Sequence, residues 1–227
     1  FEPFSLPSLA VVGTGKRVGK TAVTGYVARL LAADRRFVVV AMGRGGPPEP
    51  EVITVPPTVE ALVALSREGR HAASDHLETA ALVGVETVGA RRCGGGLAGA
   101  VFSSNVREAA RVAERMAPDL VVFDGSGAAL PPVAADRTLV VVGGHQRPEV
   151  ASGYLNAFRL LRADLVVVTM AEEGTGWERT RDAVRGVVPD GVEVVAIVLR
   201  PRPAMEIRGR TVAYFCTAPA SAHATLA

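Results

Sequence analysis

Lysine is almost absent from this sequence of 227 residues, in which Lys16 and Lys20 stand against 23 arginines. Cysteine is equally scarce, because the chain contains only Cys93 and Cys216. These two cysteines lie far apart in the sequence and outside any Cys-x-x-Cys spacing, which argues against a structural zinc site and against a disulfide scaffold. Two lone cysteines suit a reducing cytosol, so we expect a cytoplasmic protein.

The sequence also lacks an excess of charge of one sign and a long apolar run. It has 25 basic and 23 acidic residues, a balance that does not predict a nucleic-acid partner. No apolar stretch approaches the roughly 20 residues needed to span a bilayer, and no signal-peptide pattern is present, so we expect no membrane association. Because 48% of the residues are hydrophobic and 21% are charged, a large buried core is expected.

Seven apolar runs predict β-strands, and most of them are continuous, as is typical of parallel strands buried on both faces. Helical patterns separate these runs, and three of them begin at candidate capping pairs, in which an Asp, Asn or Thr is followed three residues later by Glu. This order predicts a doubly wound α/β domain with a mainly parallel seven-stranded sheet, whose ligands bind beyond the carboxyl ends of the strands. The predicted strands are Leu9–Val12, Phe37–Met42, Leu120–Phe123, Thr138–Val142, Leu165–Thr169, Val192–Leu199 and Thr211–Phe215.

The candidate capping pairs are Asp75 with Glu78, Asn105 with Glu108, and Thr175 with Glu178. The first helix is expected from Lys20 to about Ala33, with a core-facing stripe of Val23, Val27, Leu30 and Leu31. We expect one domain over residues 1–227. Since the chain opens on Phe1 rather than Met, we also expect a fragment of a longer polypeptide.

The stretch Gly-Thr-Gly-Lys-Arg-Val-Gly-Lys-Thr follows the first predicted strand and opens the first predicted helix. This context is typical of a phosphate-binding P-loop, whereas a glycine turn without a ligand is the simpler alternative. Both lysines of the chain fall inside it, which favours a chemical role, since a slim ammonium fits a tight loop better than a planar guanidinium does. The predicted nucleotide-binding residues are Gly13, Thr14, Gly15, Lys16, Arg17, Val18, Gly19, Lys20 and Thr21.

Individual roles follow from the positions within this loop. Lys20 is expected to reach the β- and γ-phosphates, and the hydroxyl group of Thr21 to ligate Mg²⁺. Lys16 and Arg17 lie at the loop tip, placed to face the transferred group or a second anionic ligand. Asp124 follows the buried run Leu120–Phe123 and resembles a Walker B carboxylate that binds Mg²⁺, although a turn or N-cap Asp is common there. We take Lys16, Lys20 and Asp124 as the candidate catalytic residues.

Other strand ends carry further candidates. Arg44 lies among glycines and is interpreted as a phosphate clamp. Glu49 or Glu51 could bind a metal or act in acid–base chemistry, and a solvated turn explains them equally well. Arg91 and Arg92 precede Gly94–Gly96 and form with Gly95 a candidate anion site, against the alternative of a loop with incidental charge. His145 could transfer protons, but a lone loop histidine is more often a surface residue.

The spacing of the loop resembles the P-loop of dethiobiotin synthetase, because five residues separate Gly13 from Gly19. MinD- and ParA-type ATPases carry a signature lysine where this chain has Gly15, which makes that class less similar. No lysine remains for an Asn-Lys-x-Asp or Thr-Lys-x-Asp motif, so ATP is favoured over GTP. In dethiobiotin synthetase-like folds, loops at the positions of Arg200, Pro201 and Ala218 enclose the adenine.

Several stretches together resemble the cyclic 2,3-diphosphoglycerate synthetases. They are Gly-Thr-Gly-Lys-Arg-x-Gly-Lys-Thr-Ala-Val, Met-Gly-Arg-Gly-Gly-Pro, Arg-Cys-Gly-Gly-Gly-x-Ala-Gly, Phe-Asp-Gly-Ser-Gly and Leu-Arg-Pro-Arg-Pro. The resemblance implies that ATP, with Mg²⁺, phosphorylates 2-phosphoglycerate and then drives closure of the diphosphate to a cyclic anhydride. It also implies that the family's N-terminal domain is absent from this sequence.

Such a substrate is a small phosphorylated anion and needs several fixed cations, for which the chain offers Arg17, Arg44, Arg91 and Arg92 beside Lys16. A second copy of the chain is a further candidate partner. Two alternatives remain open: a carboxylate-activating ligase of the dethiobiotin synthetase type, and a slow ATPase that acts as a switch on a protein partner.

Overall fold

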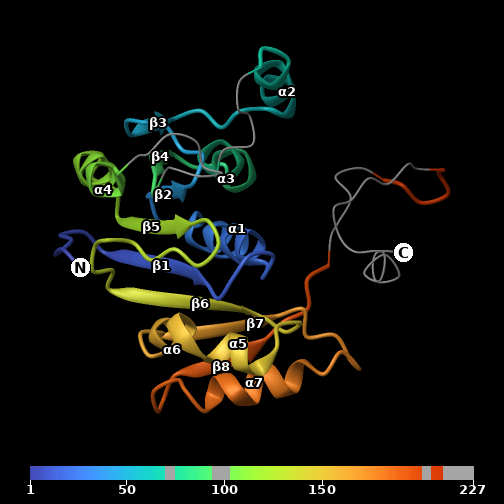
Figure 1. The fold of residues 1–227 in the computed structure, drawn as a ribbon. Helices are drawn as coiled ribbons and strands as arrows, with labels where there is room; N and C mark the ends of the chain where they lie inside the picture. The colour runs from blue at the N-terminus through green and yellow to red at the C-terminus, as the bar shows by residue number, and fades with distance from the viewer. Residues whose placement is uncertain (70–74, 94–102, 201–205, 212–227) are drawn as a thin grey trace.

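The computed structural model describes residues 1–69, 75–93, 103–200 and 206–211 (Figure 1). Within these residues one eight-stranded sheet has the order β3-β4-β2-β5-β1-β6-β7-β8. All neighbouring strands are parallel except β3 and β4, which are antiparallel. The strands are β1 (Ser8–Gly13), β2 (Phe37–Gly43), β3 (Glu51–Ile53), β4 (Thr87–Arg91), β5 (Leu120–Gly125), β6 (Arg137–Gly143), β7 (Leu165–Thr169) and β8 (Glu193–Ala196).

Helices cover both faces of this sheet, as Figure 1 shows. Alternate residues of the central strands pack into separate clusters, one of which includes α4 while another includes α1. A third cluster joins β6, β7 and β8 to α5, α6 and α7. The helices are α1 (Lys20–Leu31), α2 (Val59–Arg67), α3 (Asp75–Val83), α4 (Val106–Arg115), α5 (Pro148–Ser152), α6 (Tyr154–Leu160) and α7 (Trp177–Arg185). The predicted doubly wound α/β fold is confirmed.

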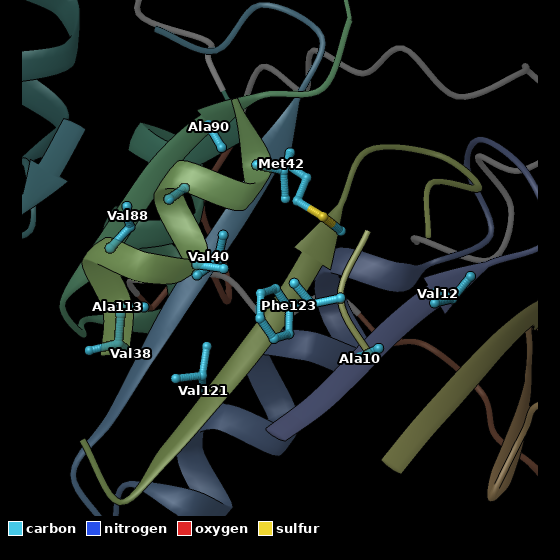
Figure 2. Close-up of a cluster of buried hydrophobic side chains, with 14 residues drawn as sticks. Ala10, Val12, Val38, Val40, Met42, Val88, Ala90, Ala113, Val121 and Phe123 are labelled. Carbon is cyan, nitrogen blue, oxygen red and sulfur yellow. The ribbon is translucent and has the colours of Figure 1, made fainter. Parts of the chain in front are cut away.

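The buried core surrounds the central strands and extends to their carboxyl ends. Figure 2 shows Phe123 of β5 between Val40 of β2 and Ala10 of β1, all of them buried. Runs such as Val38–Met42 are buried at every position because helices cover both sides of the sheet. This packing fixes the last residues of β5, where Asp124 follows Phe123.

Six of the seven predicted strands are present, but the predicted number of strands was wrong. β3 and β4 were missed because β4 reads Thr-Val-Gly-Ala-Arg and β3 contains only three residues, so neither presents a long apolar run. The predicted strand Val192–Leu199 is limited to β8. Of the predicted strand Thr211–Phe215, only Thr211 is described, without strand structure, and residues 212–215 lie outside the described part.

The predicted face of the first helix was partly wrong. Val23 is buried, but Leu30 is 58% exposed, and the small residues Thr24, Gly25 and Ala28 are buried instead. Small side chains let the helix approach its neighbours closely, so the buried stripe follows residue size as well as hydrophobicity.

Two of the three capping pairs were also wrong. Gly176 rather than Thr175 caps α7, and the side chain of Asn105 caps nothing. Instead, Asn105 accepts a hydrogen bond from the backbone N–H of Arg91 at 2.7 Å. It also donates to the carbonyl groups of Pro47 and Pro48 at 3.1 and 3.0 Å.

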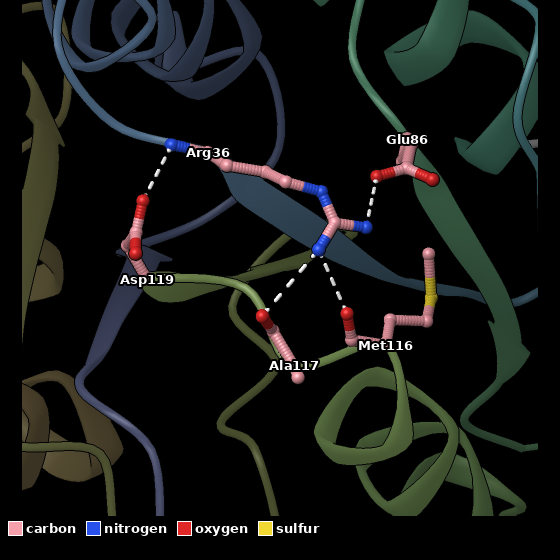
Figure 3. A network of polar contacts seen from close by, with 5 residues as sticks. All are labelled: Arg36, Glu86, Met116, Ala117 and Asp119. Atoms are coloured by element: carbon pink, nitrogen blue, oxygen red, sulfur yellow. Dashed lines mark hydrogen bonds and ion pairs between the residues drawn. The ribbon is translucent and has the colours of Figure 1, made fainter.

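Arg36 joins segments at the amino end of the strands, where β2 begins (Figure 3). Its guanidinium pairs with Glu86 at 2.7 Å and donates to the carbonyl group of Met116 at 2.8 Å, while its backbone N–H donates to Asp119 at 2.9 Å. These bonds join the segments that precede β2, β4 and β5. Arg36 therefore joins the amino ends of these three strands, away from the candidate site.

α3 packs on β4 through a buried histidine. The ring of His76 lies over Gly89, where a Cβ atom would come within 2.7 Å of the ring. The Nε2 atom of His76 lies 3.3 Å from a carboxylate oxygen of Glu51 on β3. Burial lowers the pKa of His76 below its ordinary 6.5, and the charges of Glu51 and Asp75 oppose that shift in part.

This lowered pKa predicts a loss of stability in mild acid. Between pH 6.5 and the lower folded-state pKa of His76, the unfolded chain binds more protons than the folded chain, so the free energy of unfolding falls as pH falls. Thermal unfolding at pH 7.5 and pH 5.5 should show a smaller acid-induced loss for His76→Gln than for the wild type. His145→Gln, at an exposed loop position, serves as the control and should match the wild type. Equal losses in all three proteins would contradict the assignment.

Candidate functional site

The loop between β1 and α1 has the backbone shape of an anion cradle. Gly19, the N-cap of α1, has a φ of 78°, and Arg17 has a φ of 58°, both in the left-handed region. Gly19 forms no side-chain cap hydrogen bond, and the first turn of α1 contains no acidic residue. An N-terminus of this kind offers its backbone N–H groups and its partial positive charge to a bound anion.

Side chains from two later elements, α6 and β7, hold this loop in shape. Asn156 of α6 donates to the carbonyl oxygen of Thr14 at 3.0 Å, and Thr169 of β7 donates to that of Val18 at 2.7 Å. Arg159 donates to the side-chain oxygen of Asn156 at 2.9 Å and also to the carbonyl group of Ala128 at 3.0 Å. With these carbonyl groups engaged, the loop is preorganised rather than free to adapt to a ligand.

A cavity of about 490 Å³ opens between this loop, the end of β5 and α3. Its charged lining is mixed, with four basic and three acidic side chains: Lys16, Arg17, Lys20, Arg44, Asp75, Glu78 and Asp124. The cavity also exposes Thr21, Thr79 and Ser126. Its size is within the range of small-molecule sites.

Lys20 and Asp124 meet in an ion pair at the floor of this cavity. The side chain of Asp124 is 6% exposed and that of Lys20 is 10% exposed, so both charges are largely removed from water. Burial raises the pKa of Asp124, and the neighbouring charge of Lys20 opposes the shift. Each charge of the pair therefore holds the other in place, and burying both of them carries a desolvation cost. A cation or a phosphate bound beside the pair would change that cost.

The structure brings most of the predicted loop residues to the cavity. Residues 15–21 line it, whereas Gly13 and Thr14 lie behind it and support the loop. Thr14 is buried, and a Cβ atom on Gly13 would come within 2.8 Å of the carbonyl oxygen of Gly127. The loop after β5 thus packs directly against the start of the phosphate loop.

The predicted arginines divide into two groups. Arg44 lines the cavity, and Arg92 donates to Ser126, a lining residue, at 3.2 Å. Arg91 instead donates to the carbonyl group of Gly46 at 2.5 Å and so supports the loop that carries Arg44.

Other predicted residues are not placed at the cavity. Glu49 is exposed and does not line it, because the loop before it is held toward Asn105 through Pro47 and Pro48. Arg200 pairs with Glu172 at 3.0 Å, outside the lining. Gly95, Pro201 and Ala218 lie outside the described residues.

Sequence reasoning missed the acidic side of the cavity on α3. Asp75 and Glu78 were interpreted as a capping pair, yet their spacing of three also places two side chains on one face of a helix. Thr79 beside them was not considered. Asn156 and Thr169 were missed as well, because their contacts join segments more than 100 residues apart and leave no local pattern.

Thr21 and Asp124 supply the oxygen donors that suit Mg²⁺ bound beside phosphates, since both line the cavity. Across the described ranges, no group of three or more His, Cys, Asp or Glu side chains could by itself hold a metal ion. Mg²⁺ commonly retains waters and phosphate oxygens among its ligands, so two protein donors are compatible with it. Among those same residues, no helix is both long and apolar enough to cross a membrane.

Comparison with known proteins agrees with this geometry. A family model described as the P-loop domain of cyclic 2,3-diphosphoglycerate synthetase matches residues 8–198. A cyclic 2,3-diphosphoglycerate synthetase of Rubrobacter xylanophilus is 57% identical over 222 residues, which cover 94% of this chain and 50% of that protein. One from Methanothermobacter thermautotrophicus is 46% identical over 224 residues, covering 95% and 48% respectively. The chain therefore spans about half the length of the curated relatives it matches.

A solved structure supports the fold independently. LpxK from Aquifex aeolicus in complex with ATP aligns with a TM-score of 0.51 over 77% of this chain and 52% of that chain. At 17% sequence identity this similarity establishes the P-loop NTPase fold alone.

The hydrogen bonds that hold the phosphate loop in shape lead to a prediction for one variant and for a matched control. Thr169→Val removes the donor to the carbonyl group of Val18 and should cost about 1–3 kcal/mol of stability, because a buried acceptor loses its partner. It should also weaken ATP binding in isothermal titration calorimetry. Thr87→Val makes the same substitution at a buried position in β4, where the hydroxyl group donates to the carbonyl group of Val85 and not to the phosphate loop. This control should leave the affinity for ATP unchanged. An equal loss of affinity in both variants would contradict the role of Thr169 in holding the phosphate loop.

Proposed function

Because the chain belongs to the cyclic 2,3-diphosphoglycerate synthetase P-loop domain family, we propose that it transfers phosphoryl groups from ATP to 2-phosphoglycerate and then drives ring closure of the diphosphate. The observation that carries this proposal is the cavity in which the phosphate loop and additional cations meet. The whole reaction is part of the proposal, since the chain spans about half of its relatives.

The donor side of the cavity is formed by the loop and the end of β5. ATP would place its phosphates against the N-terminus of α1, with Lys20 at the β- and γ-phosphates. Thr21 and Asp124 would hold Mg²⁺, which supplies charge neutralisation for the transferred group. The segment after β8, where Arg200 lies, is the expected side for the adenine.

The acceptor side of the cavity is formed by basic side chains other than Lys20, the lysine that would bind the phosphates of ATP. Lys16, Arg17 and Arg44 line the cavity, and Arg92 approaches it through Ser126. A carboxylate with one phosphate, and later two, requires several such charges at fixed positions. Because phosphoryl transfer depends mainly on positioning and charge neutralisation, these side chains would orient the acceptor in line with the γ-phosphate.

The same cations weigh against the other candidate functions. A ligase of the dethiobiotin synthetase type would bind an amine or carbamate, for which four basic side chains in one cavity are in excess. An ATPase switch would need no acceptor site at all.

Phosphorus NMR of the whole natural polypeptide with ATP, Mg²⁺ and 2-phosphoglycerate tests this proposal. The wild type should produce diphosphoglycerate and then cyclic anhydride signals. Lys20→Ala should lower the rate by about 10²–10³-fold, since a preorganised charge opposite the transferred group is lost.

Arg137→Ala removes an exposed cation from the opposite end of β6 and should retain the wild-type rate. Hydrolysis of ATP to ADP and free phosphate without any new phosphoester would rule out this acceptor. A melting curve of Lys20→Ala is needed beside it, because the unpaired buried Asp124 could cost about 3–5 kcal/mol.

A further inference from the structure

Two carboxylates on the first turn of α3 face the cavity in which the proposed donor and acceptor meet. Asp75 and Glu78 both line it, together with Thr79, opposite the phosphate loop. Apart from Mg²⁺, every ligand in the proposed reaction is an anion, so a carboxylate at this position repels the nucleotide and the acceptor by Coulomb's law. Such residues persist in a phosphate site when they bind a metal, pair with a cation or accept a proton.

The first two explanations do not account for this pair. Asp124 already pairs with Lys20, and neither Asp75 nor Glu78 forms an ion pair within the portion of the chain that the structure describes. In the proposed site Mg²⁺ is held by Thr21 and Asp124, and among those residues Asp75 and Glu78 do not complete a three-carboxylate metal site with Asp124. With the metal assigned to Thr21 and Asp124, proton acceptance is the role that remains for one of the two carboxylates.

The two carboxylates differ in their surroundings. Asp75 is the first residue of α3 and packs against Gly43, where a Cβ atom would lie 2.5 Å from its carboxylate oxygen. Glu78 lies one turn further along and is exposed to the cavity, so a substrate can reach it.

We propose that Glu78 is the general base of the first phosphoryl transfer and takes the proton of the 3-hydroxyl group of 2-phosphoglycerate. This inference rests on the proposed function. The O–H bond of the acceptor breaks and its proton moves to the carboxylate of Glu78. The acceptor oxygen bonds to the γ-phosphorus, the bond from that phosphorus to the β–γ bridging oxygen breaks, and ADP leaves. Since Glu78 is exposed, its proton then returns to solvent.

The charges around Glu78 suit this role. Glu78 is exposed to the cavity but partly buried, and this partial burial raises its pKa, as do the charges of Asp75 and Asp124, while Lys20 lowers it. Lys16 and Arg17 of the loop and Arg44 after β2 line the same cavity. A carboxylate whose pKa is moved toward neutrality accepts a proton more effectively than an ordinary one.

The second step gives this proposal a sharp test, because its acceptor carries no hydroxyl proton. A phosphate oxygen of 2,3-diphosphoglycerate, already ionised near neutral pH, takes the γ-phosphoryl group of ATP and releases ADP. The other phosphate then attacks the activated phosphorus and expels inorganic phosphate. No base is required in either event, so Glu78 should matter for phosphorylation and not for ring closure.

The experiment compares Glu78→Gln with the wild type in the whole natural polypeptide, starting separately from 2-phosphoglycerate and from 2,3-diphosphoglycerate. For the first substrate, kcat should fall by about 10²–10⁴-fold and the acid limb of its pH profile should disappear. For the second substrate, kcat should stay within about threefold, because no proton is removed there. The KM for ATP should be unchanged with both substrates, and Glu78→Asp should recover part of the lost rate.

Glu108→Gln is the matched control, since Glu108 also lies exposed in the first turn of a helix, on the opposite face of the sheet. An equal loss with both substrates, or no loss with either, would overturn the role of Glu78 and leave the proposed function standing. A wild-type protein that converts neither substrate would overturn both.

Discussion

The ion pair between Lys20 and Asp124 is the contact on which the site depends. It joins the start of α1 to the end of β5, and both charges are almost completely removed from water. In the interior of a protein each charge is costly alone, so the position of one residue fixes the position of the other. Phosphates and Mg²⁺ would compete for the same two groups, which means that ligand binding exchanges one set of charge contacts for another rather than filling an inert cavity.

The two halves of the sheet contribute differently to this site. The half formed by β6, β7 and α6 holds the phosphate loop from behind through neutral hydrogen bonds from Asn156 and Thr169. The half formed by β2, β4 and α3 places charged side chains in front of it, including Arg44 and Glu78. The cavity thus lies where the strand order changes direction next to β1, as expected for ligands in doubly wound sheets.

The sequence predicted the features that depend on local pattern. Continuous apolar runs revealed six strands, and the order strand, glycine-rich turn, helix identified the loop with Lys20. The acidic face of α3 was not predicted, because Asp75 and Glu78 fit a capping pair equally well and only the packing of α3 beside β2 brings them to the cavity. β4 was missed because Gly89 interrupts its apolar run. The ring of His76 lies over that glycine, and this contact cannot be inferred from the local sequence.

A crystal structure of the whole natural polypeptide with a non-hydrolysable ATP analogue, Mg²⁺ and 2-phosphoglycerate would test the central claim most directly. The account predicts that Lys20 turns from Asp124 to the phosphates. The acceptor oxygen should lie in line with the γ-phosphorus at about 3–3.5 Å, between the loop and α3. Phosphoglycerate bound away from this cavity, or Lys20 still paired with Asp124 beside the bound nucleotide, would contradict the account.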